Sequence, residues 1–275
     1  RTFDGNKYFK DEDGSCFRAY RFVDNSKAYD TVDSAEVFGK SGKAFGRFQK
    51  YLSDFPAESL SEIIKNFHNT IWRYENEFIP AVQADKADRA VNCGEEIKFV
   101  MHRREDCKKL VELIEKGELP LRVTHNDTKL NNVLFDSDSD DAICVIDLDT
   151  VMPGLALYDF GDSIRFGANS CAEDDDNYDK VELMLDYFEA YAKGFLSEAG
   201  DALNQCEIDN LAFSAKLMTF ECGMRFLTDY LNGDTYFKTA YPEHNLVRAK
   251  NQFALVADME RKMEQMQQII KNITE

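Results

Sequence analysis

The sequence predicts an α+β fold in which a short β region precedes a large, mostly helical part. Alternating apolar residues flank a turn within residues 7–24, which is typical of a β-hairpin. From Ser34 onward apolar residues recur at helical spacing through most of the chain. The exception is residues 121–151, where strand-like runs are joined by polar turns. A chain of 275 residues is long enough for one large domain or two lobes.

Composition excludes several classes of protein. With 44% hydrophobic and 12% aromatic residues the chain is not disordered. No window approaches the roughly 18 apolar residues of a membrane helix, so no membrane partner is expected. A net charge of −18 repels nucleic acid and anionic lipid; it would favour a cationic substrate, or simply reflects an acidic surface. No obligate protein partner is evident. Seven scattered cysteines without a CxxC pair fit a cytoplasmic location.

The first elements follow from local signals. The turn at 11–14 should join two strands, the second running through CFRAYRFV at 16–23. Ser34 is placed as the N-cap of a helix reaching about Leu52. The helix contains GKSGKAFG, which fails as a Walker A loop because Ser34 stands where its first glycine should be. Its glycines are interpreted as allowing close helix packing.

The remaining elements are mainly helical. Residues 56–117 are predicted to be helical and to stop at Gly117 before Pro120. The apolar, β-branched run Ala142 to Ile146 predicts a buried strand. Later helices are expected at 180–199, 207–230 and 243–272. The acidic segment 171–179 lacks EF-hand spacing and is interpreted as a solvated loop.

The stretch VTHNDTKLNNVLFD, residues 123–136, contains the groups that phosphoryl transfer requires. Asp127 can face an acceptor hydroxyl, and Lys129 can reach a phosphate as a point charge. Asn132 offers an amide oxygen to Mg²⁺, while Asp147, at the end of the following strand, offers a carboxylate. Any one of these residues alone would be unremarkable in a turn; the ordered pair of motifs is far more specific.

HNDTKLNN resembles the HxDxxxxN loop shared by protein kinases and by aminoglycoside and choline phosphotransferases, and VIDLDT resembles the second metal-binding motif of that superfamily. Three phrases are similar to the N-acetylhexosamine 1-kinases over essentially the whole chain: HNDTKLNNVLFD, VIDLDTVMPGLALYDFGDSIRFGAN and RFLTDYLNGDTYFK. The resemblance implies a protein-kinase-like, aminoglycoside-phosphotransferase-like fold. It also implies a kinase dependent on ATP and Mg²⁺ that phosphorylates the anomeric hydroxyl of N-acetylglucosamine or N-acetylgalactosamine.

The resemblance also implies roles for individual residues. Asp127 would be the catalytic base, Lys129 a phosphate contact, and Asn132 and Asp147 the Mg²⁺ ligands. Among supporting residues, His125 would brace the loop. Asp159 would hold the loop backbone, although capping its own helix is an equal alternative.

Substrate contacts are implied in the same way. For the sugar the resemblance points to Arg225, Tyr236 and the region of Phe166, and a guanidinium fork with aromatic faces suits a pyranose. For ATP, CFRAYRFVD resembles the hinge between kinase lobes, so the backbone of Arg21 and Val23 would bind adenine.

A kinase small lobe should place a phosphate-binding loop and a strand lysine before this hinge, yet only some 16 residues precede it. We therefore expect residues 1–24 to be the remnant of a small β lobe with its hinge, residues 25–275 to be the large lobe, and the chain to be a fragment. Two alternatives stay open: a kinase for a cationic small molecule such as choline or an aminoglycoside, and a non-catalytic, pseudokinase-like binding module.

Overall fold

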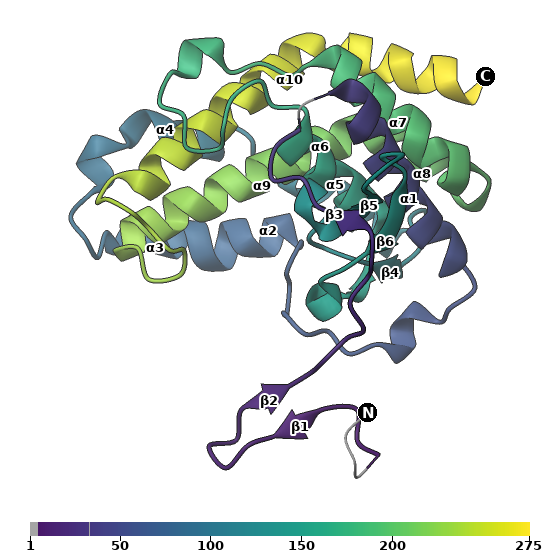
Figure 1. Ribbon diagram of the computed structural model, residues 1–275. Coiled ribbons are helices and arrows are strands. Elements are labelled where there is room, and N and C mark those ends of the chain that lie inside the picture. The colour runs from purple at the N-terminus through teal and green to yellow at the C-terminus, as the bar shows by residue number, and fades with distance from the viewer. Residues whose placement is uncertain (1–4, 33) are drawn as a thin grey trace.

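The computed structural model describes residues 5–32 and 34–275, so the first four residues of the predicted β-lobe remnant lie outside it. A body of helices surrounds a small group of short strands (Figure 1). The helices are α1 (Ala35–Tyr51), α2 (Thr70–Arg73), α3 (Ile79–Ala84), α4 (Gly94–Met101), α5 (Arg104–Glu115), α6 (Ala156–Gly167), α7 (Leu185–Ala199), α8 (Gln205–Asp209), α9 (Leu211–Asn232) and α10 (His244–Thr274). The strands are β1 (Phe9–Lys10), β2 (Cys16–Phe17), β3 (Ser26–Lys27), β4 (Arg122–Thr124), β5 (Val133–Asp136), β6 (Ala142–Val145) and β7 (Met152–Gly154). The predicted α+β class and kinase-like architecture are confirmed.

The N-terminal hairpin forms as predicted but is shorter. β1 and β2 pair antiparallel, with Phe9 opposite Phe17, and the turn is closed by Gly14 N–H donating to Asp11 O at 3.1 Å. The second strand ends at Phe17 instead of continuing to residue 23. A strand needs a neighbour to bond its backbone, and within the described residues β1 offers only two positions. Figure 1 shows the hairpin projecting from the helical body.

Two small antiparallel sheets support the central loops. In the first the strand order is β3-β5-β6, and in the second β4 pairs with β7. The predicted strand at Ala142 to Ile146 exists as β6, but the prediction that it is buried is wrong because Ile143 is 47% exposed. Successive side chains of a strand point to opposite faces of its sheet, so Ile143 points to the other face from Ala142 and Cys144 and is exposed there.

Helix prediction succeeds where caps and periodicity agree. Ser34 caps α1 by accepting the N–H of Val37 at 3.2 Å, and Gly117, with φ 74°, ends the helical region of α5. The prediction of helix throughout 56–117 is wrong for residues 60–69, which form no helix. That segment is held instead by a tertiary contact: His68 Nδ1 lies 2.7 Å from the buried carboxylate of Glu221 on α9. Long-range bonds of this kind override local propensity.

The glycines of GKSGKAFG allow α1 to pack closely on α7, as predicted. A Cβ added at Gly42 would lie 2.5 Å from Tyr191 O, and one at Gly39 would lie 3.0 Å from Ala190 O. Both contacts are with backbone of α7, which cannot move aside as a side chain can. The phosphate-loop reading of these glycines therefore has no support, since they face another helix.

We expect Gly42→Ala to lower the free energy of unfolding by about 1–3 kcal/mol, because it overpacks this helix contact by more than the gain in helix propensity returns. Urea unfolding followed by circular dichroism measures the change. Gly94→Ala is the matched control, because a Cβ at Gly94, also in a helix, would meet no atom within 4 Å. Equal stability of the two variants would contradict the close-packing interpretation.

No helix in the described ranges is both long and apolar enough to cross a bilayer.

Candidate active site

The predicted catalytic loop lies between β4 and a single 3-10 turn, Leu130–Asn132, that leads into β5. The chain bends sharply at Asn126, whose φ is 64°. Asparagine tolerates this left-handed conformation better than most residues. Its side chain fixes the bend by donating to Thr124 O at 3.2 Å and to Thr150 O at 2.9 Å. The backbone around Asp127 is therefore held by its neighbours on both sides.

Asp159, on α6, holds the same loop from beneath. It is fully buried, and its carboxylate accepts the N–H of His125 at 2.9 Å, the N–H of Asn126 at 2.8 Å and the amide of Gln49 at 2.8 Å. Asp159 lies inside the helix, whose N-cap is Leu155, so it does not occupy the capping position. Burial raises the pKa of Asp159, and the hydrogen bonds that its carboxylate accepts from the backbone of His125 and Asn126 and from Gln49 oppose that rise.

His125 connects the loop to the following strand. Its buried ring places Nε2 2.9 Å from Ile146 O, and Nδ1 accepts the N–H of Asp127 at 3.3 Å. These contacts are mutually consistent for a neutral ring protonated on Nε2. The ring therefore holds Asp127 and the end of β6 in one arrangement.

Three of the predicted chemical groups meet directly. Lys129 Nζ lies 2.9 Å from Asp127 Oδ1, and Asn132 Nδ2 donates to Asp127 Oδ2 at 3.1 Å and to Asp127 O at 2.8 Å. Burial lowers the pKa of Lys129, but the hydrogen bond and charge of Asp127 outweigh it, so the pKa lies above its usual value. The Lys129 side chain is therefore a cation beside the Asp127 carboxylate at neutral pH.

Asp147 is the second residue after β6 and has a left-handed conformation with φ 59°. Its neighbour Ile146 donates its N–H to Asn132 O at 2.9 Å, which brings the Asp147 backbone close to Asn132. Because the Asn132 amide nitrogen is already engaged, its oxygen is the atom left for a cation. Within the described residues no group of three His, Cys, Asp or Glu side chains could hold a metal ion. One amide and one carboxylate suit Mg²⁺ that brings phosphate ligands of its own.

A cavity of about 360 Å³ opens beside Asp127 and is called the inner cavity here. Its lining comprises Phe67, Asn126, Asp127, Lys129, Asp162, Arg165, Glu173, Met218, Glu221, Cys222, Arg225, Phe226, Phe237, Lys238 and Arg248. It brings Arg225 of α9 to the same space as Asp127 and Lys129, which lie about a hundred positions earlier in the chain.

The other two predicted sugar residues lie around this space, not inside it. The Arg225 guanidinium carbon is 5.8 Å from the Tyr236 ring centroid, yet Tyr236 lines a neighbouring cavity that also contains Arg225. Phe166 lines a third hollow, beside Val32 and Gly167, that shares only Arg165 and Glu173 with the inner cavity. The structure thus brings Arg225 and Tyr236 together, whereas Phe166 lines a separate hollow next to Arg165.

The sequence analysis did not predict three charged residues that line the inner cavity: Asp162, Arg165 and Glu173. Arg165 is 6% exposed and donates to Asp162 at 2.8 Å and to Glu173 at 2.6 Å. Burial would raise the pKa of Asp162, but Arg165 and other nearby cations hold it below its usual value. Glu173 therefore does not belong to a purely solvated loop. The Asp162 and Arg165 pair at i,i+3 on α6 was the available signal.

The two residues implied for adenine binding lie after the hairpin. Arg21 is exposed, and Val23 is partly buried with its carbonyl accepting the Ser26 hydroxyl at 2.7 Å. Neither residue belongs to a strand.

Comparison with known proteins identifies the family of the chain. A family model described as the phosphotransferase enzyme family matches residues 7–194, more than half of the chain. The chain belongs to this phosphotransferase family. The match contains both motifs, HNDTKLNN and VIDLDT.

Solved structures share the fold. An ethanolamine kinase from Plasmodium vivax is 17% identical with a TM-score of 0.53, over 84% of this chain and 64% of that one. A choline kinase from Cryptosporidium parvum is 14% identical with a TM-score of 0.58, over 97% of this chain and 75% of that one. A microcompartment-associated aminopropanol kinase is 16% identical with a TM-score of 0.52, over 94% and 76%. This chain thus spans less than two thirds of the ethanolamine kinase.

Proposed function

We propose that this phosphotransferase is a kinase that transfers the γ-phosphoryl group of ATP to the anomeric hydroxyl of an N-acetylhexosamine. The observation that carries the choice of acceptor is the charge of the inner cavity. Its carboxylates are already paired, and its aromatic faces already carry guanidinium groups. Such a cavity suits a neutral, hydroxyl-rich acceptor better than an ammonium ion.

The pairing can be followed residue by residue. Asp127 contacts Lys129, Asp162 and Glu173 contact Arg165, and Glu221 contacts His68. Each carboxylate of the inner cavity thus already has a partner among the described residues, for which an incoming cation would have to compete.

The aromatic side chains are likewise occupied. The Arg225 guanidinium lies 5.0 Å from the ring centroid of Phe67, 5.4 Å from that of Phe237 and 5.8 Å from that of Tyr236. A quaternary ammonium ligand would need those faces for itself. Arg225 can instead donate several hydrogen bonds to sugar hydroxyls or an acetamido carbonyl, since within the described residues it has no carboxylate partner.

In the proposed reaction Asp127 accepts a hydrogen bond from the acceptor hydroxyl and orients its oxygen toward the γ-phosphorus. The oxygen–phosphorus bond forms as the bond to the leaving ADP oxygen breaks, and the hydroxyl proton passes to Asp127. An anomeric hydroxyl is more acidic than an ordinary alcohol, so a carboxylate is a sufficient base. Lys129 balances negative charge on the transferred phosphoryl group.

Asn132 and Asp147 are proposed to hold Mg²⁺ on the nucleotide, and the backbone of Arg21 and Val23 to face the adenine. Bound Mg²⁺ would neutralise phosphate charge in the transition state. The Asn132 amide nitrogen donates two hydrogen bonds to Asp127 and thereby leaves the amide oxygen available to the proposed Mg²⁺. Residues 1–24 are proposed to belong to a small β lobe.

A panel of acceptors tests the assignment. With Mg²⁺ and ATP we expect N-acetylglucosamine or N-acetylgalactosamine to give an alkali-stable but acid-labile sugar 1-phosphate, identified by ³¹P NMR. Choline, ethanolamine, aminopropanol and an aminoglycoside form the second arm, because three structures of this fold are named for amino alcohols. Turnover restricted to the second arm would overturn the sugar assignment and leave the phosphotransferase class intact.

Arg225→Lys should raise KM for the hexosamine by about 10-fold or more, because lysine keeps the charge but loses the planar fork. The KM for ATP should change little, since the substitution lies on the acceptor side of Asp127. Steady-state kinetics with each substrate varied in turn measures both values. An effect confined to the KM for ATP would contradict the placement of Arg225.

A further inference from the structure

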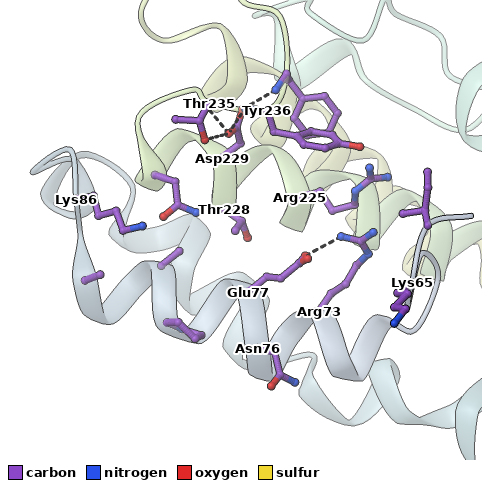
Figure 2. A pocket seen from close by; sticks show the side chains of 16 residues that line it. Lys65, Arg73, Asn76, Glu77, Lys86, Arg225, Thr228, Asp229, Thr235 and Tyr236 are labelled. Carbon is purple, nitrogen blue, oxygen red and sulfur yellow. Dashed lines mark hydrogen bonds and ion pairs between the residues drawn. The ribbon is translucent and has the colours of Figure 1, made fainter. Parts of the chain in front are cut away.

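A second cavity of about 490 Å³ lies between α2–α3 and α9 and is called the outer cavity here (Figure 2). It is lined by Ile64, Lys65, Arg73, Asn76, Glu77, Pro80, Ala81, Ala84, Lys86, Arg225, Thr228, Asp229, Asn232, Thr235, Tyr236 and Phe237. Arg225 and Phe237 also line the inner cavity, so the two spaces adjoin at these side chains. A ligand that reaches Asp127 past Arg225 could therefore extend into the outer cavity.

The outer cavity carries excess positive charge. Its lining has four cationic side chains and two carboxylates. One carboxylate, Glu77, is paired with Arg73 at 2.7 Å. The described part of the chain offers no carboxylate partner to Lys65, Lys86 or Arg225, although a net charge of −18 makes acidic groups plentiful elsewhere. Figure 2 shows Lys86 and Lys65 at opposite ends of the cavity, with Arg225 near Arg73.

The second carboxylate, Asp229, has no capacity left for these cations. It accepts the backbone N–H groups of Thr235 at 2.9 Å, Tyr236 at 2.8 Å and Phe237 at 2.9 Å, and the amide of Asn245 at 2.9 Å. These bonds fold the 235–237 segment over the cavity and use the carboxylate oxygens. With four cations and two carboxylates, the lining therefore keeps an excess of positive charge.

Part of that charge is rigidly placed. Arg73 is 8% exposed and donates Nε–H to Phe67 O at 2.6 Å. The Phe67 ring lies 5.7 Å from the Arg73 guanidinium and 5.0 Å from that of Arg225. Two guanidinium groups held near one ring lose little conformational freedom when they meet an anion. This distinguishes the cavity from a surface where lysines are merely solvated.

We propose that the outer cavity is a subsite for a carboxylate-bearing sugar attached to the acceptor hexosamine, so that the preferred substrate is an acidic disaccharide with the hexosamine at its reducing end. This rests on the proposed function, because it needs the anomeric hydroxyl at Asp127. Substituents at C3 or C4 of a pyranose lie on the side of the ring away from C1, and so point from Asp127 toward the outer cavity. Arginine and lysine are the groups that bind a carboxylate there.

Two disaccharides differing only in this charge provide the test: glucuronosyl-β1,3-N-acetylgalactosamine and galactosyl-β1,3-N-acetylgalactosamine. We expect kcat/KM for the acidic disaccharide to be about 10-fold or more above that for the neutral one, as charge-assisted bonds allow. The preference for the acidic disaccharide should weaken as the salt concentration is raised from about 0.05 to about 0.5 M, because salt screens the attraction between the lysines and the carboxylate. Equal values for the two disaccharides would overturn the proposal.

A double variant, Lys65→Gln with Lys86→Gln, locates the effect. The ratio of kcat/KM for the acidic disaccharide to that for the neutral one should fall by about threefold, because the two unpaired lysines are removed while Arg73 and Arg225 remain. The matched control is Lys180→Gln, an exposed lysine that lines neither cavity and should keep the ratio. An unchanged ratio in the double variant would also overturn the proposal.

N-acetylgalactosamine alone separates this proposal from the one it rests on. Turnover of the monosaccharide with no preference between the disaccharides rejects the acidic subsite only. If no sugar is turned over, the sugar assignment fails, and calorimetric titration of both disaccharides decides whether the outer cavity still selects the carboxylate.

Discussion

Asp127→Ala is expected to lower kcat for sugar phosphorylation by about 10²–10⁴-fold, the range typical of a lost general base. The carboxylate is the group that we propose orients the acceptor oxygen, and its removal also frees Lys129, which it contacts at 2.9 Å. KM for ATP should change far less than kcat. A coupled assay of ADP release at saturating sugar and ATP measures the change.

Two further variants make this result interpretable. Asp127→Asn keeps the shape and removes only the charge, so it should be nearly as inactive. Asp138→Ala is the control, because Asp138 is an exposed aspartate on the turn between β5 and β6, away from both cavities. Full activity in Asp127→Ala would reject Asp127 as the base. Binding of Mg²⁺-ATP without turnover by the unmodified protein would favour the pseudokinase alternative.

Asp159→Ala is expected to reduce the free energy of unfolding by about 3 kcal/mol or more, because three buried donors lose their acceptor and each costs about 1–3 kcal/mol. Those donors are the backbone N–H groups of His125 and Asn126 and the Gln49 amide. The catalytic loop should lose its fixed position as well, so kcat should fall together with stability. Urea unfolding and steady-state kinetics on the same preparations measure both.

A conservative variant tests whether Asp159 only supports the loop or also takes part in the reaction. Asp159→Asn retains one acceptor oxygen, so we expect a smaller loss of stability and partial recovery of kcat. Asp138→Ala again serves as the control for removing an aspartate. A variant Asp159→Ala that is as stable as the control but inactive would show that Asp159 takes a direct part in the reaction and does more than support the loop.

Local sequence signals predicted the features that depend on neighbouring residues. Ser34 is an N-cap, the 11–14 turn closes a hairpin, and Gly117 ends a helical region because each depends on backbone geometry within a few positions. The predictions failed where a distant element decides the outcome. The non-helical segment 60–69 is held by the contact of His68 with Glu221 on α9. The exposure of β6 depends on where this strand lies in its sheet.

The candidate site divides in the same way. The order and spacing of His125, Asp127, Lys129 and Asn132 were enough to predict phosphoryl transfer, because one short loop supplies most of the groups. Only the folded chain decided which charges remain unpaired. The pairing of Asp162 and Glu173 with Arg165 is local, since these residues lie within a dozen positions of one another. The approach of Arg225 to Phe67, in contrast, joins α9 to the segment before α2.

By itself, the sequence therefore determined the chemical groups of the catalytic loop and the class of reaction they suit. The tertiary structure decided the character of the proposed acceptor space: an inner cavity whose carboxylates have partners and an outer cavity with an excess of cations. The physical reason is that a residue type specifies its own charge, whereas neutralisation depends on distance. Across a hundred or more positions of chain, helix packing sets that distance.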